Sequence, residues 1–575
     1  MNFDTKIQNR MEFLYSSERA AELSARVQKL IQKYGFRIPE TPSASRKWSQ
    51  NDVILITYGD VILPQNGRRD KLQTLADFLT RHLGDSISAV HILPFFTSSS
   101  DRGFSVIDYK DVRDDLGNWD DIEDLTHKYR VMVDLVINHT SRYSTWFENY
   151  QKGEGPGKDY FIEMDPTTDL SMAVRPRSSP LLTSVKTHDG LRYVWTTFSD
   201  DQIDLDFTNP DVLLEFIDIF LFYLSKGVKL IRLDAIAYLW KKIGTKSIHL
   251  NETHQVVKLF RDLTDYIDPE AKLITETNVP FEENISYFGD GDETHMVYQF
   301  SLPPLLLHAI LTENAHYLSK WAANLPEPPG GCTYFNFTAS HDGIGVRPLE
   351  GLVPNKDFEY LIKSTEERGG FVSYKANSDG SQSPYELNIT YYDAFADPDI
   401  ENSDLQIKRF LCSQIITLSL KGVPAIYFHN LTATHNYVDG VAETGEKRAI
   451  NRKQWRYDEL HRNLDDSASP THFMLKKFKE LLDIRKQHSA FSPRAGQKVV
   501  NLGDKFFGIY RFSVDENEAV LCISNITSKE QTIPAEEFKS YTNDEPELVN
   551  LLDGKTSSLQ QELTLDAFET VWLEL

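Results

Sequence analysis

From Asp52 onward, short apolar runs alternate with amphipathic stretches in which apolar residues recur at helical spacing. Eight of the runs have the length and composition of strands that are buried on both faces of a parallel sheet. They cover residues 53–57, 88–93, 131–137, 228–234, 273–276, 295–300, 333–338 and 423–428. Alternation of this kind is typical of consecutive strand and helix pairs. The pattern therefore predicts an α/β fold, a (β/α)8 TIM barrel, with insertions because a bare barrel needs only about 250 residues.

The helix expected before the run 228–234 has clear start and stop signals. Asn209 can cap its first turn, Pro210 suits the first helical position, and Gly227 can end the helix. The strand that follows is therefore well defined, and it carries Arg232 and Asp234.

Changes in the pattern divide the chain into parts. Residues 1–48 predict a helical extension, and residues 49–141 predict the first part of the barrel. Residues 142–206 are too many for a simple connection, so we expect an inserted domain there. Residues 207–489 complete the barrel and include a second insertion at about 348–398. Residues 490–575 contain short strand-like runs and predict a C-terminal all-β domain.

The chain has 575 residues, with 61 Lys and Arg against 85 Asp and Glu, and so a formal net charge of −24. This balance argues against a nucleic-acid partner or an anionic membrane surface. The N-terminus lacks a signal-peptide pattern, and no apolar segment is long enough to span a membrane. The three cysteines are far apart and odd in number, which suits reduced thiols. We therefore expect a cytoplasmic protein, and its oligomeric state, including a homodimer, is left open.

Polar residues gather where the predicted strands end. The set comprises Asp134, Asn138, His139, Arg232, Asp234, Glu276, His341 and Asp342. In a barrel the C-terminal ends of the strands share one face, and active sites lie there. A structural ion pair is the alternative for any one of these groups taken singly. Six acidic or imidazole groups converging on one barrel mouth favour an active site instead.

Asp234 and Glu276 lie on consecutive predicted strands and have the chemistry of the carboxylate pair in a retaining glycosidase-type mechanism. One carboxylate attacks the anomeric carbon, the other donates a proton to the leaving oxygen, and the two lie about 5–5.5 Å apart. Arg232, two residues before Asp234, is expected to keep that carboxylate ionised, as a nucleophile must be. Glu276 has no adjacent cation in the sequence, so we expect its pKa to be raised, as a general acid/base requires.

Four blocks of sequence carry a family resemblance: DLVINH (134–139), IRLDAIAY (231–238), ITETN (274–278) and ASHDGIG (339–345). In order and spacing they resemble the signature regions of glycoside hydrolase family 13, the α-amylase clan. The resemblance implies that Asp234 is the nucleophile, Glu276 the general acid/base and Asp342 a transition-state stabiliser. It also implies contacts to the sugar from His139, Arg232, Tyr238 and His341.

A narrower resemblance is carried by HILPFFTSSSDRGFSVIDY, VRPRSSPLL, VWTTFSDDQIDLDF, QFSLPPLLLHA and AINRK. These segments are similar to the sucrose phosphorylase subfamily, whose members transfer glucose from a glucoside to inorganic phosphate. The resemblance implies that the glucose subsite is completed by Asp101, Phe104, Gln202 and Arg452. It also implies that Arg177 binds phosphate or the leaving acceptor, and a guanidinium does offer a planar fork for phosphate oxygens. The alternative for Arg177 is a solvated loop charge.

Two departures from sucrose phosphorylases concern the acceptor. The segment SPYELN places Glu386 where those enzymes tend to have a glutamine, and ETNVP places Thr277 and Asn278 where they tend to have a histidine. Both features resemble relatives that act on glucosylglycerate or glucosylglycerol. A carboxylate at position 386 would accept hydrogen bonds from vicinal hydroxyls. The alternative is a solvated charge on the second insertion.

The sequence thus predicts a retaining α-glucoside phosphorylase, a hexosyltransferase that uses a small-molecule glucoside and inorganic phosphate. We expect α-D-glucose 1-phosphate as product and 2-O-α-glucosylglycerate or glucosylglycerol as the favoured donor. Three alternatives stay open: a sucrose or sucrose 6-phosphate phosphorylase, an α-glucoside hydrolase or transglycosylase, and an inactive barrel that acts as a binding subunit. No cofactor is expected. Calcium is often bound in the wider clan near the residue equivalent to Asn138, but the sequence has no acidic cluster at ligand spacing, so we predict no metal.

Overall fold

The computed structural model describes the chain except for residues 1, 39–45, 66–69, 378–379, 401–402, 539–540, 542–546 and 559–560. Eight parallel strands close into a barrel in the spatial order β1-β18-β14-β13-β12-β11-β6-β3. Their bounds are β1 (Ile54–Thr57), β3 (Ala89–Ile92), β6 (Arg130–Val136), β11 (Leu230–Asp234), β12 (Lys272–Thr275), β13 (Met296–Tyr298), β14 (Thr333–Phe337) and β18 (Val423–Tyr427). Each predicted run supplies one of these strands, so the predicted barrel is confirmed.

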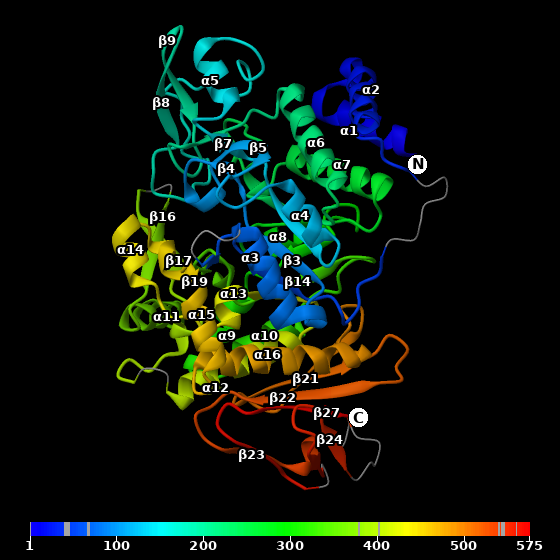
Figure 1. Ribbon diagram of the computed structural model, residues 1–575, viewed down its shortest axis with the longest axis vertical. Helices are drawn as coiled ribbons and strands as arrows, with labels where there is room; N and C mark the ends of the chain where they lie inside the picture. Colours follow the sequence, from blue (N-terminus) through cyan, green and yellow to red (C-terminus); the bar gives the residue numbers. More distant parts are fainter. Residues whose placement is uncertain are drawn as a thin grey trace.

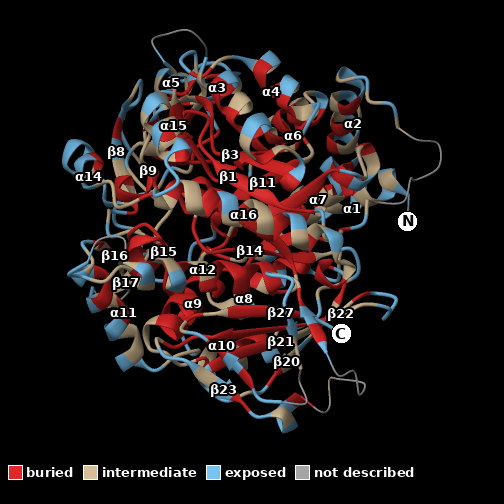
Figure 2. Ribbon diagram, turned by 60° about the horizontal axis from the view of Figure 1, so that its bottom comes forward, coloured by how far each residue is buried: buried red, intermediate tan, exposed pale blue. Residues whose placement is uncertain are grey.

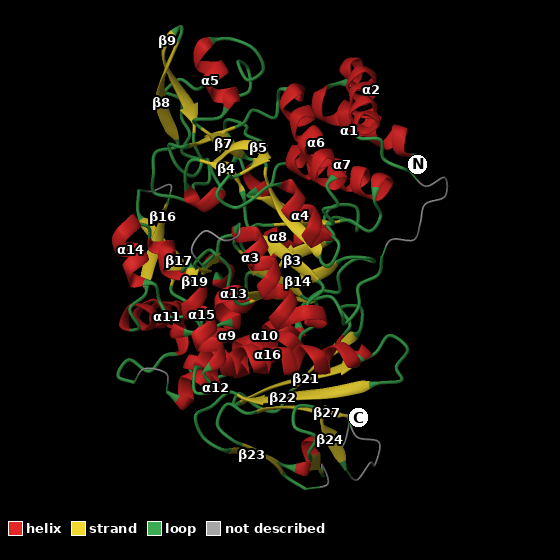
Figure 3. Cartoon of the chain, viewed as in Figure 1, coloured by secondary structure: helices red, strands yellow, loops and turns green. Residues whose placement is uncertain are grey.

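Helices alternate with the strands along the chain and surround the barrel (Figures 1 and 3). They are α3 (Lys71–Phe78), α4 (Trp119–Thr126), α6 (Pro210–Ser225), α7 (Asn251–Ile267), α8 (Phe281–Ile285), α9 (Leu302–Leu311), α10 (His316–Ala323), α12 (Asp404–Ser419), α13 (Phe428–Leu431), α14 (Val438–Thr444), α15 (Tyr457–Asp465) and α16 (Pro470–Gln487). The strands are buried (Figure 2), because helices cover the barrel outside and side chains fill it inside. One of the largest fully buried side chains is Arg232, so the barrel encloses a charge.

Helix α6 begins where its sequence signals predict. The backbone N–H of Asp211 donates to the Asn209 side chain at 3.0 Å, and Pro210 is the first helical residue. Gly227 follows the helix with a φ of +82°, a left-handed conformation that glycine adopts at little steric cost. The chain then turns directly into β11, whose last residue is Asp234.

Two N-terminal helices, α1 (Phe3–Tyr15) and α2 (Ser17–Lys33), pack against α7 and α6 on the outside of the barrel (Figure 1). The buried residues of α2 include Leu23, Val27 and Ile31, which lie on one face because they are four residues apart. At the end of α2, Lys33 pairs with Asp218 of α6 at 2.8 Å.

Two excursions leave the barrel beyond the C-terminal ends of its strands. In the first, β7 (His139–Ser141) pairs with β10 (Gln202–Asp204), and α5 (Thr145–Lys152) and the hairpin of β8 (Leu182–Thr187) and β9 (Gly190–Trp195) lie between them in sequence. In the second, β15 (Ile344–Gly345), β17 (Gln382–Asn388) and β16 (Phe371–Ala376) form a sheet that accompanies α11 (Asn355–Glu367). Two further pairs are β2 (Ile62–Leu63) with β19 (Trp455–Arg456), and β4 (Phe96–Ser98) with β5 (Val106–Val112).

The C-terminal part is all-β, as predicted. Its six-stranded sheet contains β20 (Gly496–Val500), β21 (Phe506–Phe512), β22 (Ala519–Asn525), β27 (Thr570–Glu574), β24 (Leu548–Asn550) and β25 (Thr556–Ser557), and β23 (Gln531–Ile533) pairs with β26 (Leu563–Leu565). The indole N–H of Trp572 donates to the hydroxyl of Ser419 in α12 at 2.7 Å, so the sheet is fixed to the barrel. In Figure 1 this sheet lies at the opposite end of the molecule from β8 and β9. Among the helices of the described residues, none has both the length and the apolarity needed to cross a membrane.

Candidate active site

Three carboxylates, Asp234, Glu276 and Asp342, line one pocket at the C-terminal ends of the barrel strands. Asp234 is the last residue of β11, Glu276 directly follows β12, and Asp342 lies beyond the end of β14. Because β11 and β12 are hydrogen-bonded neighbours, the residues at their ends face the same mouth. The fold therefore brings together the three residues that were predicted to be catalytic.

Arg232 connects two of these carboxylates. Its Nη1 donates to Asp234 Oδ1 at 2.7 Å, and its Nη2 lies 3.9 Å from Glu276 Oε2. The backbone N–H of Ala235 also donates to Glu276 Oε2, at 3.2 Å. Ala235 has a φ of +50°, a left-handed conformation that a residue other than glycine keeps only when its surroundings hold it. Arg232 and Ala235 thus fix the two carboxylates relative to each other.

Asp134 lies behind Arg232. The aspartate is fully buried, forms an ion pair with Arg232 Nη1, and hydrogen-bonds to His91 Nε2 at 2.7 Å. The guanidinium carbon also lies 5.5 Å from the ring centroid of Tyr298 and 5.7 Å from that of Phe104. A buried cation that lost such a partner would be strongly destabilising, so Asp134 serves to hold Arg232 in place.

The pKa shifts of Asp234 and Glu276 agree only in part with the expectation from the sequence. Burial raises the pKa of Glu276, as expected, while Arg232 opposes the shift. The expectation that Arg232 lowers the pKa of Asp234 enough to keep it ionised is not met, because burial raises the pKa of Asp234 more than Arg232 lowers it, and the neighbouring carboxylates add to the rise. Two interacting acids titrate as a pair. Because Arg232 lies closer to Asp234 than to Glu276, the proton that the pair shares is favoured on Glu276.

Asp342 is the carboxylate that is held most firmly in its charged form. Burial would raise the pKa of Asp342, but the cation of Arg448 and then His341 and Arg452 outweigh this and lower it. Arg448 Nη1 is 2.6 Å from Asp342 Oδ1, and Arg452 Nη2 is 3.8 Å from the same atom.

The residues predicted to bind glucose surround the same mouth. Nη1 of Arg452 is 3.5 Å from Asp101 Oδ1, and its Nε donates to the carbonyl of His341 at 2.8 Å. The ring of Phe104 stacks on that of His341, with centroids 4.6 Å apart. The amide of Gln202 lies 3.2 Å from His139 Nε2. The members that line the pocket are Asp101, Phe104, His139, Arg177, Gln202, Tyr238, His341 and Glu386, while Arg232 and Arg452 are buried behind it.

A β-bulge in the second excursion brings two neighbouring side chains to the pocket. Ser373 pairs with Glu386 but Tyr374 pairs with Pro384, so Tyr385 is an extra residue in β17. Tyr385 and Glu386 both line the pocket. Glu386 is 2% exposed, and Nε and Nη2 of Arg448 donate to its two oxygens. The alternative of a solvated surface charge at Glu386 is therefore wrong.

Arg177, in the first excursion, is half-buried at the pocket. Its guanidinium carbon lies 5.3 Å from the ring centroid of Tyr385 and 5.8 Å from that of Phe198. A cation over aromatic faces is attracted by their electron density and keeps its N–H groups free for other acceptors. Arg177 therefore connects the two excursions across the pocket.

The sequence was compared with known proteins. The family "Alpha amylase, catalytic domain" matches residues 70–324, and the "Cyclo-malto-dextrinase C-terminal domain" matches residues 508–574. A glucosylglycerate phosphorylase from Spirochaeta thermophila is 42% identical over 577 residues, which cover 98% of this chain and 97% of the relative. The chain belongs to glycoside hydrolase family 13. Within this family it falls in the sucrose phosphorylase subfamily, close to the glucosylglycerate phosphorylases.

Two further similar proteins support this placement within family 13. A glucosylglycerate phosphorylase from Escherichia coli is 41% identical, covering 93% of this chain and 94% of the relative. The crystal structure of sucrose 6F-phosphate phosphorylase from Thermoanaerobacter thermosaccharolyticum has a TM-score of 0.73 at 25% identity, covering 92% of this chain and all of that one.

Sequence reasoning missed several pocket residues of this family 13 site. Phe198, Tyr385 and Arg448 line the pocket, as does Asn278, which was noted only as a departure from sucrose phosphorylases. Arg448 directly precedes the quoted motif AINRK and lies four residues before Arg452, so its closeness to that motif was the signal available. Tyr385 gave no such signal, because alternation along a regular strand would place it on the face opposite Glu386.

A lysine ammonium lies beside Asn138. Nζ of Lys241 donates to Asn138 Oδ1 and pairs with Asp204 Oδ2, each at 2.6 Å. Asp204 is fully buried and also accepts from the backbone N–H of Thr197 at 2.8 Å. Lys241 thereby joins the chain after β11 to both ends of the first excursion.

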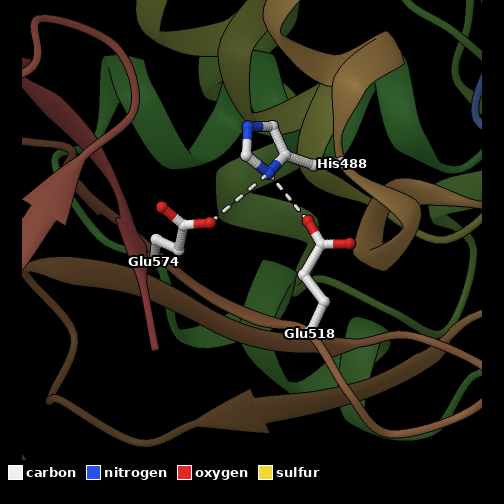
Figure 4. A group of neighbouring side chains, drawn as sticks. All are labelled: His488, Glu518 and Glu574. Carbon is white, nitrogen blue, oxygen red and sulfur yellow. Dashed lines mark hydrogen bonds and ion pairs between the residues drawn. The ribbon is translucent and has the colours of Figure 1, made fainter.

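A second group of potential metal ligands lies outside the barrel mouth. His488, Glu518 and Glu574 bring three ligand atoms within 4.8 Å of one another (Figure 4). His488 Nδ1 is already hydrogen-bonded to Glu518 at 2.7 Å, and Glu518 accepts from the backbone N–H of Ser489 at 2.7 Å. These contacts connect the end of α16 to the C-terminal sheet, and we assign the group a structural role.

We expect Lys241→Met to lower the melting temperature. The substitution leaves Asp204 buried without a cation, and breaking a buried pair in this way typically costs about 3–5 kcal/mol. Thermal unfolding followed by circular dichroism measures the effect, with Lys242→Met as the exposed control. EDTA is expected to leave the wild-type melting temperature unchanged. Equal melting temperatures for the two variants, or a fall with EDTA, would contradict this role for Lys241.

Proposed function

We propose that the chain is a retaining α-glucoside phosphorylase that transfers glucose from a small glucoside to inorganic phosphate and gives α-D-glucose 1-phosphate. The observation that carries the proposal is the pair Asp234 and Glu276 around Arg232, with the anionic Asp342 beside it. Each buried carboxylate costs desolvation energy. A barrel that served only as a binding subunit would have little reason to retain three of them at one mouth.

The proposed reaction has two displacements. An oxygen of Asp234 attacks the anomeric carbon while Glu276 gives its proton to the leaving glycosidic oxygen, so that a glucosyl ester replaces the glycosidic bond. A phosphate oxygen then attacks the same carbon, its proton passes to Glu276, and the ester bond breaks. Two inversions retain the α configuration, and both carboxyl groups return to their starting states.

Arg177 is proposed to bind the incoming phosphate or an anionic leaving group. In the described part of the chain no carboxylate forms an ion pair with Arg177, so its charge is available to an anion. Its place between the rings of Phe198 and Tyr385 holds the planar guanidinium at the pocket. That fork suits a carboxylate or phosphate better than a point charge would.

For the acceptor we propose glycerate or glycerol, so that 2-O-α-glucosylglycerate or 2-O-α-glucosylglycerol is the donor. The 41–42% identical relatives are named glucosylglycerate phosphorylases, whereas the sucrose 6F-phosphate phosphorylase is 25% identical. A glycerate carboxylate would also meet the cation of Arg177. Sucrose and sucrose 6-phosphate remain the alternative donors, and water or a second sugar the alternative acceptors, because the carboxylate chemistry is the same.

The nucleophile assignment predicts that Asp234→Asn removes nearly all activity, since an amide cannot form the glucosyl ester. The wild type should give the α anomer of glucose 1-phosphate, measured by proton NMR of the product. A β-phosphate product, or an Asp234→Asn variant with more than a trace of the wild-type rate, would contradict the mechanism.

For Arg177, we expect Arg177→Ala to weaken phosphorolysis more than glucosyl transfer to water, because only phosphate uses the cation. Rates are measured with and without phosphate, as glucose 1-phosphate and as free glucose. Arg192→Ala, an exposed arginine of the same excursion, is the matched control. An equal loss in both reactions would indicate that Arg177 has only a structural role.

Donor choice is tested by kcat/KM for 2-O-α-glucosylglycerate, 2-O-α-glucosylglycerol, sucrose and sucrose 6-phosphate. We expect one of the first two to be best, and Glu386→Gln to damage its use more than that of sucrose, because a carboxylate accepts hydrogen bonds from the vicinal hydroxyls of glycerate or glycerol with both of its oxygens and an amide with only one. Glu443→Gln, an exposed glutamate, is the control. Sucrose or its phosphate as best donor would overturn the acceptor choice and leave the phosphorylase proposal standing.

A further inference from the structure

Arg448 joins two acidic side chains that come from different parts of the chain. It lies in a 3-10 helix (Lys447–Asn451), whereas Glu386 is on β17 and Asp342 follows β14. Nε and Nη2 of Arg448 donate to the two oxygens of Glu386, and Nη1 is 2.6 Å from Asp342 Oδ1. One guanidinium therefore connects the second excursion to a carboxylate of the catalytic centre.

The contacts with Glu386 fix the orientation of the Arg448 guanidinium. The bidentate pair with Glu386 sets both the position and the plane of the guanidinium, which a single contact would leave free to turn. Nη1, which Glu386 does not engage, then lies 2.6 Å from Asp342 Oδ1 as an ion pair. The other nitrogens near Asp342 are farther away: Nη2 of the Arg452 cation is at 3.8 Å and His341 Nε2 is at 3.5 Å, and burial lowers the pKa of His341 well below its ordinary value.

Glu386 has a second consequence for Arg448. An arginine with no other partner would turn its fork toward Asp342 and occupy both oxygens of that carboxylate. Because Glu386 takes Nε and Nη2, Arg448 offers Asp342 only Nη1. The other oxygen of Asp342 stays available to a sugar hydroxyl, and hydrogen bonds to sugar hydroxyls that strengthen in the transition state accelerate glucosyl transfer.

We propose that Arg448 is a positioning residue for Asp342, and that Glu386 acts on catalysis by orienting Arg448. The inference rests on the proposed glucosyl transfer, in which Asp342 stabilises the transition state. Glu386 would then affect catalysis through Arg448 as well as through any direct contact with the acceptor.

The charges around Asp342 give the proposal a distinctive signature. The groups that face it are Arg448, Arg452, His341, Arg232, Asp234 and Glu276. Burial raises the pKa of Glu276 and opposes the ionisation of Asp342, and Arg448 lowers the pKa of both carboxyl groups. Removing its charge raises both pKa values. The alkaline limb of the rate profile requires protonated Glu276, so this limb moves to higher pH. The acid limb requires the ionised nucleophile Asp234, and Arg448 is not among the main charges that shift its pKa.

The test uses hydrolysis of α-D-glucosyl fluoride by the full chain without phosphate, which needs neither the phosphate site nor the natural acceptor. We expect Arg448→Met to lower kcat roughly 100-fold, the scale of losing one electrostatic stabiliser, with a much smaller change in KM. The alkaline limb of its pH profile should lie at higher pH than in the wild type. Arg448→Lys keeps the charge but not the fork, so it should restore the alkaline limb and only part of kcat.

Two more variants separate positioning from general damage. Glu386→Gln should lower kcat without raising either limb, since it removes a negative charge and leaves the cation. Lys447→Met removes the neighbouring exposed cation and should leave both limbs in place. Three outcomes would each overturn the proposal: an alkaline limb that does not move in Arg448→Met, an alkaline limb in Arg448→Lys that matches that of Arg448→Met, or a rise of this limb in Glu386→Gln. If the wild type does not hydrolyse the fluoride with retention, the proposed function has failed instead.

Discussion

The active site depends on one buried cation, Arg232, which is 2% exposed. Taking a guanidinium out of water costs several kcal/mol unless charged partners surround it. The barrel supplies them through its register, because Arg232 of β11 lies directly beside Asp134 of β6 and two residues before Asp234. The same strand pairing that closes the barrel therefore positions the groups that carry the chemistry.

The walls of the site depend on similar pairs between segments far apart in sequence. Lys241 pairs with Asp204 at the base of the first excursion, and Arg448 pairs with Glu386 of the second. Such pairs add little net stability when desolvation is counted, but breaking one leaves an uncompensated buried charge. Their value here is geometric, because they hold two polar, irregular excursions at fixed places around one pocket.

The proposed acceptor side has a different construction from the proposed glucose side. On the glucose side, Asp101 pairs with Arg452 and the ring of Phe104 stacks on that of His341, and these residues lie on segments that follow the barrel strands β3, β14 and β18. On the acceptor side, a β-bulge brings Tyr385 to the pocket beside Glu386, and Arg177 lies over the ring of Tyr385. A bulge re-aims side chains without altering the barrel, so this wall can differ between relatives that share the same catalytic centre.

The sequence by itself determined the eight strands, their order and the gathering of Asp234, Glu276 and Asp342 at one mouth, because these follow from local periodicity and barrel topology. Only the tertiary structure decided what each charge meets. Sequence neighbours suggested that Arg232 keeps Asp234 ionised, but burial, which no local pattern reports, raises the pKa of Asp234. Glu386 is buried because Arg448, 62 residues away, neutralises it, and such a contact exists only after the chain has folded.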